Sequence, residues 1–143
     1  MIVVGFDGSE CASKAVRWAA AEAALRGTEV LVMYGWQIAQ ATPLALKERG
    51  WSGYVPPMEE LQRAVRERVE RQVAAAVPAE QAALLRYEAS PEHPVKLLVT
   101  ASKNAELLVV GSRGHAPAVS LVLGSVSLAC VHQAHCPVVV VRD

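Results

Sequence analysis

The segment ELLVVGSRGHAPAVSLVLGSVS (residues 106–127) contains the pattern that decides the fold. An apolar run, Leu107 to Val110, is followed by a segment with three glycines, and helical spacing of apolar residues then extends over Gly124 to Ala134. This order predicts a buried strand, a glycine-containing loop and a helix. The loop either turns the chain or holds an anion at the helix N-terminus.

Other apolar runs of strand length occur along the chain. They are Ile2 to Phe6, Val30 to Tyr34, Val138 to Val141 and, more weakly, Ala83 to Glu88. These runs are apolar throughout rather than alternating, which is typical of strands buried on both faces in a parallel sheet.

Segments with helical periodicity separate the strands. Besides Gly124 to Ala134, they are Cys11 to Arg26, Met58 to Val77 and Glu92 to Lys103. The resulting order, βαβαβαβαβ, predicts one α/β domain over residues 1–143. With right-handed crossovers it forms a doubly wound, five-stranded parallel sheet with helices on both faces.

Composition excludes several classes of protein. Fourteen basic and fourteen acidic side chains balance among 143 residues, so net charge favours neither nucleic acid nor an anionic membrane. The opening MIVVGFDGSE has no basic region, so we expect neither a signal peptide nor an anchor. Three cysteines without CxxC spacing argue against disulfides or zinc and favour a reducing, cytoplasmic location.

Three predicted loops leave the carboxyl ends of strands, where open parallel sheets bind ligands. Asp7-Gly8-Ser9 follows the first strand, and two interpretations stay open: Asp7 or Ser9 caps the first helix, or the Asp7 carboxylate accepts hydrogen bonds from a ribose. Gly35 follows the second strand and begins an unusually long connection, Trp36 to Pro57, typical of a binding segment or a loop packed on its own aromatics.

The third loop is the glycine segment that follows Leu107 to Val110. Its glycines match neither familiar phosphate-binding loop. The Walker pattern requires a lysine, and the chain has none after Lys103; the GxGxxG pattern requires a glycine that is missing between Gly111 and Gly114. What is left is GxxG, nine residues, then Gly-Ser.

Each part of this pattern has a physical use. Gly111 and Gly114 permit positive φ and close backbone approach to an anion. Gly124 and Ser125 begin a helix whose first amides favour phosphate, with the Ser125 and Ser127 hydroxyls and the Arg113 guanidinium as further donors.

No nucleophile and base form a recognisable catalytic pattern, so no catalytic residue is predicted. Among the four histidines, His115 lies in the glycine loop itself, where its ring could contact a phosphate.

Taken together, these residues resemble the universal stress proteins, in the branch with the motif G-2x-G-9x-G(S/T). Here the motif is Gly111, Gly114, Gly124 and Ser125; IVVGFDGSECASKAVRWAA, AELLVVGSRG, LGSVS and HCPVVVVR extend the resemblance over nearly the whole chain. The resemblance implies a Rossmann-like sheet in the order 3-2-1-4-5 that binds ATP, often with Mg or Mn. It also implies a homodimer formed through Val138 to Val141.

The resemblance also implies roles within the site. Asp7 holds the ribose, the motif residues hold the triphosphate, and the backbone near Gly35 contacts the adenine. The complete predicted nucleotide site is Asp7, Gly8, Ser9, Gly35, Gly111, Arg113, Gly114, His115, Gly124, Ser125, Val126 and Ser127.

The chain departs from the family in the middle of the loop, where many relatives have further glycines and small residues. Here the residues are His115-Ala116-Pro117-Ala118-Val119, and Pro117 removes one amide donor. The favoured function is an ATP-binding stress-response regulator. The alternatives are an enzyme that uses ATP in slow hydrolysis or in phosphoryl or adenylyl transfer, a cyclic AMP or AMP binder, and a nucleotide-free dimeric scaffold.

Overall fold

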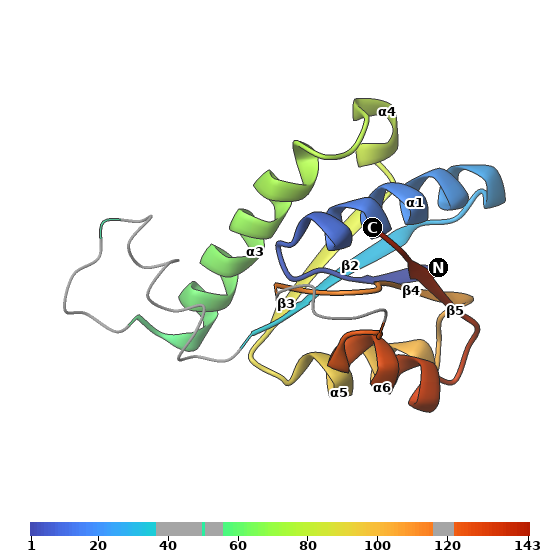
Figure 1. Cartoon of the computed structure of the whole chain (residues 1–143). Helices are drawn as coiled ribbons and strands as arrows, with labels where there is room; N and C mark the ends of the chain where they lie inside the picture. Colours follow the sequence, from blue (N-terminus) through green and yellow to red (C-terminus); the bar gives the residue numbers. More distant parts are fainter. Residues whose placement is uncertain (37–49, 51–55, 116–121) are drawn as a thin grey trace.

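The computed structural model describes residues 1–36, 50, 56–115 and 122–143. Its five strands are all parallel and lie in the order β3-β2-β1-β4-β5 (Figure 1). This result confirms the predicted doubly wound sheet and its strand order. The strands are β1 (Ile2–Gly5), β2 (Val30–Gly35), β3 (Leu85–Ser90), β4 (Leu107–Gly111) and β5 (Val138–Val141).

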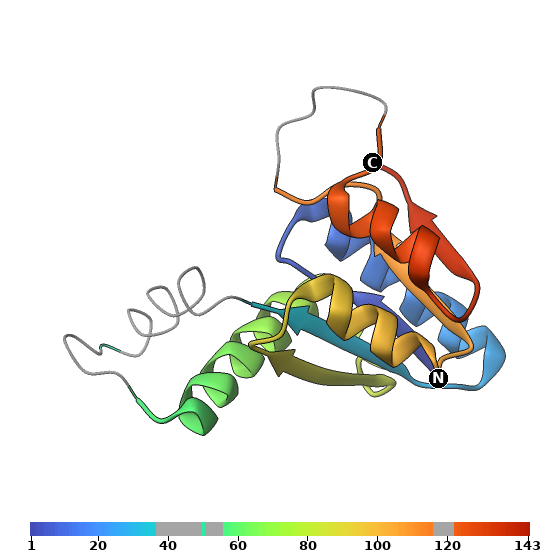
Figure 2. The same ribbon diagram turned by 90° about the horizontal axis from the view of Figure 1, so that it is seen from below.

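Helices cover both faces of the sheet, as predicted. Figure 1 shows α1 and α3 on one face and α5 and α6 on the other, and Figure 2 gives the second view. The short helix α4 was not predicted, because one turn has no apolar period to detect. The helices are α1 (Glu10–Arg26), α3 (Met58–Ala74), α4 (Ala79–Ala82), α5 (Pro94–Ser102) and α6 (Ser125–Gln133).

Alternation along the strands divides the core into two layers. Ile2 and Val4 pack with the alanines of α1, whereas Val3 packs with Leu98 of α5 and Cys130 of α6. All three β1 residues are fully buried. Because β1 is central and covered on both faces, its carboxyl end is held rigidly where the strand order reverses, between β1 and β4.

Local signals explain where α1 begins and ends. The Ser9 side chain accepts a hydrogen bond from the Ala12 amide, and Gly27 ends the helix with a left-handed φ of 64°. Ala15 and Ala19, both fully buried, let the helix lie close to the sheet.

Most of the predicted connection from Trp36 to Pro57, and residues 116–119 of the glycine loop, lie outside the described residues. Trp36 itself is 2% exposed and packs with Leu61 and Val65 of α3. Cys11, Cys130 and Cys136 are free thiols, as expected. Within the described ranges, no helix has the length and apolarity needed to cross a membrane.

Candidate functional site

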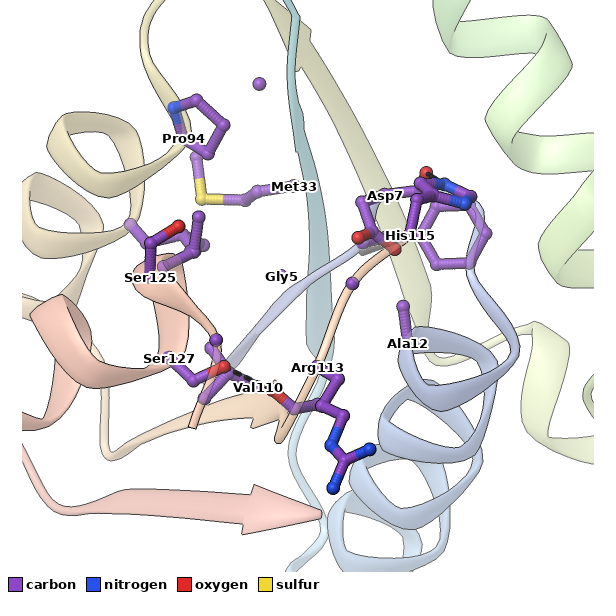
Figure 3. Close-up of a pocket in the computed structure, with 17 residues that line it drawn as sticks. Gly5, Asp7, Ala12, Met33, Pro94, Val110, Arg113, His115, Ser125 and Ser127 are labelled. Atoms are coloured by element: carbon purple, nitrogen blue, oxygen red, sulfur yellow. Dashed lines mark hydrogen bonds between the residues drawn. The ribbon is translucent and has the colours of Figure 1, made fainter. Parts of the chain in front are cut away.

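A cavity of about 270 Å³ lies at the carboxyl ends of β1 and β4 (Figure 3). The strand order reverses there, so the loops after these two strands diverge to opposite faces and leave a crevice between them. All the predicted site residues line this cavity except Gly8 and Ser9. Those that line it are Asp7, Gly35, Gly111, Arg113, Gly114, His115, Gly124, Ser125, Val126 and Ser127.

The structure of the loop after β1 shows which of Asp7 and Ser9 caps the first helix. Ser9 is the cap: its hydroxyl oxygen accepts the Ala12 N–H at 3.1 Å, and its own N–H donates to Asp7 Oδ1 at 2.9 Å. Gly8 adopts a φ of 84°, which few other residues tolerate. Gly8 and Ser9 therefore shape the turn and are not among the residues that line the cavity, whereas Asp7 does line it.

Glycine is required at residues 111 and 114 because neighbouring atoms lie too close for a β-carbon. It is not required by a positive φ angle. Both residues permit positive φ, but among the described glycines only Gly8, Gly27 and Gly50 have it. A β-carbon at residue 111 would lie 2.9 Å from Cys11 Sγ, and one at residue 114 would lie 2.5 Å from Asp7 Oδ2. Gly111 thus lets β4 pack on α1, while Gly114 brings bare backbone beside the Asp7 carboxylate.

The N-terminus of α6 opens onto the cavity. Gly124 is the N-cap, and its amide donates to Ser112 O at 2.8 Å. The next three amides, of Ser125, Val126 and Ser127, belong to the first helical turn and have no carbonyl partner within the helix. Together with the positive end of the helix dipole, they form a site suited to an anion.

The Ser127 hydroxyl has a hydrogen-bond partner within the chain. It donates to Gly111 O at 2.5 Å, and the side chain is buried. In this structure the hydroxyl proton is therefore not available to a phosphate. It ties the beginning of α6 to the end of β4 and so fixes the direction of the helix amides.

Sequence reasoning missed the apolar wall of the cavity. Gly35 lines the cavity, and a β-carbon there would lie 2.8 Å from Pro94 Cα, so β2 and α5 nearly touch. Strand ends alone could have suggested Met33 and Val110, but the packing of α5 could not be read from the pattern. The missed lining residues are Gly5, Phe6, Ala12, Met33, Pro94, Leu98 and Val110.

Charged groups are few around the cavity. The ionisable lining residues in the described part of the chain are Asp7, Arg113 and His115. His115 Nε2 lies 2.6 Å from Asp7 O, and Figure 3 shows the Arg113 guanidinium directed away from both. Burial raises the pKa of nearby Tyr34, with Arg68 lowering that pKa and Asp7 raising it further.

Metal binding by side chains alone has no support in the part of the chain that the structure describes. There, no group of three His, Cys, Asp or Glu side chains could hold an ion. A divalent cation at this cavity would have Asp7 as its one carboxylate ligand among the lining residues and would depend on oxygens from a ligand and from water.

The fold and the cavity define a class of protein. A doubly wound sheet in which a glycine loop, a helix N-terminus and one carboxylate meet at the switch point is an open α/β protein with a crevice at the carboxyl ends of its strands. The model of the universal stress protein family matches residues 1–142. The chain belongs to this family.

Individual relatives agree with this assignment. A universal stress protein of Thermus aquaticus is 35% identical over 146 residues, covering 99% of this chain and 97% of the relative. One from Mycolicibacterium smegmatis is 33% identical over 141 residues, covering 99% of this chain and 47% of the relative. The chain thus spans about half the length of the mycobacterial relatives that it matches.

Solved structures share the fold. A universal stress protein in complex with cAMP has a TM-score of 0.63 at 23% identity, covering 99% of this chain and 94% of the other. The Archaeoglobus fulgidus protein in complex with dAMP has a TM-score of 0.59 at 20% identity, covering 98% and 95%.

Proposed function

We propose that this chain binds an adenine nucleotide, with ATP as the cellular ligand, in the cavity between β1 and β4. It acts as a nucleotide-dependent regulator of a stress response. The observation that carries the proposal is that the α6 amides, the bare backbone of Gly114 and the Asp7 carboxylate converge on one cavity. Two fold relatives were solved with cAMP and with dAMP, which supports an adenine nucleotide.

The chemistry of the cavity walls suggests an orientation for the ligand. Phosphate oxygens would accept hydrogen bonds from the amides of Ser125 to Ser127, where the helix dipole favours negative charge. Asp7 would accept a hydrogen bond from a ribose hydroxyl, and the adenine would lie against the apolar wall that includes Met33, Pro94 and Leu98. Burial of the flat base against this wall would supply most of the apolar contact.

Regulation fits the cavity better than catalysis. Asp7 Oδ1 accepts the Ser9 N–H, and His115 is bonded to the Asp7 carbonyl, so both groups take part in loop structure. A general base must lie within hydrogen-bond reach of the proton that it removes. We therefore propose that ATP hydrolysis, if measurable, is slow.

The site is linked to an edge of the sheet, which suggests how a bound nucleotide could be sensed. Val141 O, at the end of β5, accepts the Ser112 N–H at 2.7 Å and the Cys11 thiol at 3.3 Å. A shift of the glycine loop would thus reach β5 directly. We propose that Val138–Val141, half-buried at this edge, pairs with a second copy in a homodimer. Relatives of about twice the length have room for two such domains.

Two measurements test the nucleotide assignment. Freshly purified protein is denatured and any released nucleotide is identified by mass. Calorimetric titration with ATP, AMP and cyclic AMP, and with GTP as a comparison base, then gives affinities. Failure to retain and to bind any adenine nucleotide would refute the proposal.

A matched pair of glycine variants tests the location. Gly114→Ala puts a β-carbon against Asp7 Oδ2, so the carboxylate must move; loss of one charge-assisted hydrogen bond predicts about 10- to 100-fold weaker binding. Gly27→Ala is the control, because it strains a left-handed helix cap at the other end of α1. It should lower the melting temperature and leave the affinity unchanged.

A further inference from the structure

The loops that leave β1 and β4 touch each other beside the cavity. His115 Nε2 and Asp7 O are 2.6 Å apart although the residues are 108 positions apart in sequence. On the same side, the backbone of Gly114 lies against Asp7 Oδ2, and a β-carbon at Gly8 would lie 3.8 Å from His115 Nε2. The His115 ring therefore rests on the turn after β1 (Figure 3).

The partner of the ring determines which nitrogen carries the hydrogen. A backbone carbonyl only accepts, so His115 Nε2 must be the donor to Asp7 O. Both the neutral ring protonated at Nε2 and the doubly protonated ring have this N–H. A glutamine amide reaches about as far as the imidazole Nε2 and can replace the donor, whereas alanine cannot.

The hydrogen bond of His115 is more exposed than the contacts that hold Gly111 and Ser112 at the start of the loop. Ser112 is buried and donates to Val141 O, and buried Ser127 holds Gly111 O. Gly114 and His115 are exposed. Exposed contacts break at a lower free-energy cost than those in the core, so the contact between His115 and Asp7 can break while Gly111 and Ser112 stay in place.

We propose that His115 is a latch: its ring holds Gly114 against Asp7 and sets the rate at which a phosphate-bearing ligand enters and leaves the cavity. The contact between His115 and the turn after β1 is a feature of the chain itself, whereas its effect on ligand exchange rests on the proposed function. Because the bond is made between two loops and not to the ligand, its loss speeds entry and exit together.

The closure is tested without a ligand, by amide hydrogen exchange of the full chain followed by mass spectrometry. Peptides that cover residues 7–9, where the Ser9 N–H donates to Asp7 Oδ1, are compared in the wild type, His115→Ala and His115→Gln. One net hydrogen bond predicts roughly two- to tenfold faster exchange in the alanine variant, with restoration by glutamine. Equal exchange in the wild type and the alanine variant would overturn the latch.

The effect on the ligand is measured by surface plasmon resonance with unlabelled ATP over immobilised full-length chain. In His115→Ala, the association and dissociation rate constants should both rise roughly two- to tenfold. Weaker binding through faster dissociation alone would overturn the gating role and make His115 a ligand contact. If the wild type binds no ATP, the proposed function fails, while hydrogen exchange still decides whether the loops are latched.

Discussion

Substitution of Gly111 by alanine should lower the stability of the fold, and this loss does not depend on any ligand. The new β-carbon would lie 2.9 Å from Cys11 Sγ, 3.1 Å from the Cys11 carbonyl carbon and 3.2 Å from its oxygen. The thiol could rotate, but the backbone atoms belong to the first turn of α1 and cannot move alone. Overpacking of this kind costs about 1–3 kcal/mol. With an unfolding entropy of about 0.3 kcal/mol per kelvin for this length, the melting temperature should fall by roughly 3–10 °C.

Thermal unfolding of Gly111→Ala, Cys11→Ala and the double variant measures the contact. Because Cys11→Ala removes the sulfur but not the backbone clash, the double variant should recover only part of the loss, giving a coupling energy of about 0.5–1.5 kcal/mol. An unchanged melting temperature in Gly111→Ala, together with lost nucleotide binding, would refute the reasoning. It would mean that the bare face of Gly111 is turned to the ligand and not to α1.

Three further substitutions test other contacts of the structure. Ser9→Ala removes the cap of α1 and should cost about 1 kcal/mol in denaturant unfolding, with recovery in Ser9→Asp; no loss would contradict the cap. Ser127→Ala removes the donor to Gly111 O and should cost about 1–2 kcal/mol, and a neutral effect would show that the bond contributes nothing. Burial raises the pKa of Cys130 to about 11, so its neutral thiol adds stability that is complete below about pH 9 and is lost as the pH rises towards 11. In unfolding curves from pH 7 to 10.5, Cys130→Ala should remove that part of the decline, and identical slopes would contradict it.

The fold could be predicted because its strongest signals are local. Apolar runs without alternation identify β1, β2, β4 and β5, and the structure places each within one residue of its predicted bounds. The third strand was predicted as Ala83 to Glu88 and lies two residues later, at Leu85–Ser90. It is an edge strand whose burial is uneven, so its pattern is weak.

The site could be predicted only in outline. The glycine spacing and the helix start at Gly124 located the loop correctly, because both are local. The purpose of each glycine could not be seen, since Gly111 is required by Cys11 and Gly114 by Asp7, each about a hundred residues away. The apolar wall was missed for the same reason: it is formed where the beginning of α5 meets the end of β2.

Amide chemical shifts measured during nucleotide titration test the central claim most directly, because they report binding and its location together. Addition of ATP or AMP should give saturable shifts at the amides of Gly114 and Ser125 to Ser127 and beside Asp7, with β3 and α4 unaffected. GTP at the same concentrations should give smaller shifts. No saturable change with any adenine nucleotide, or changes confined to another part of the chain, would contradict a nucleotide site between β1 and β4.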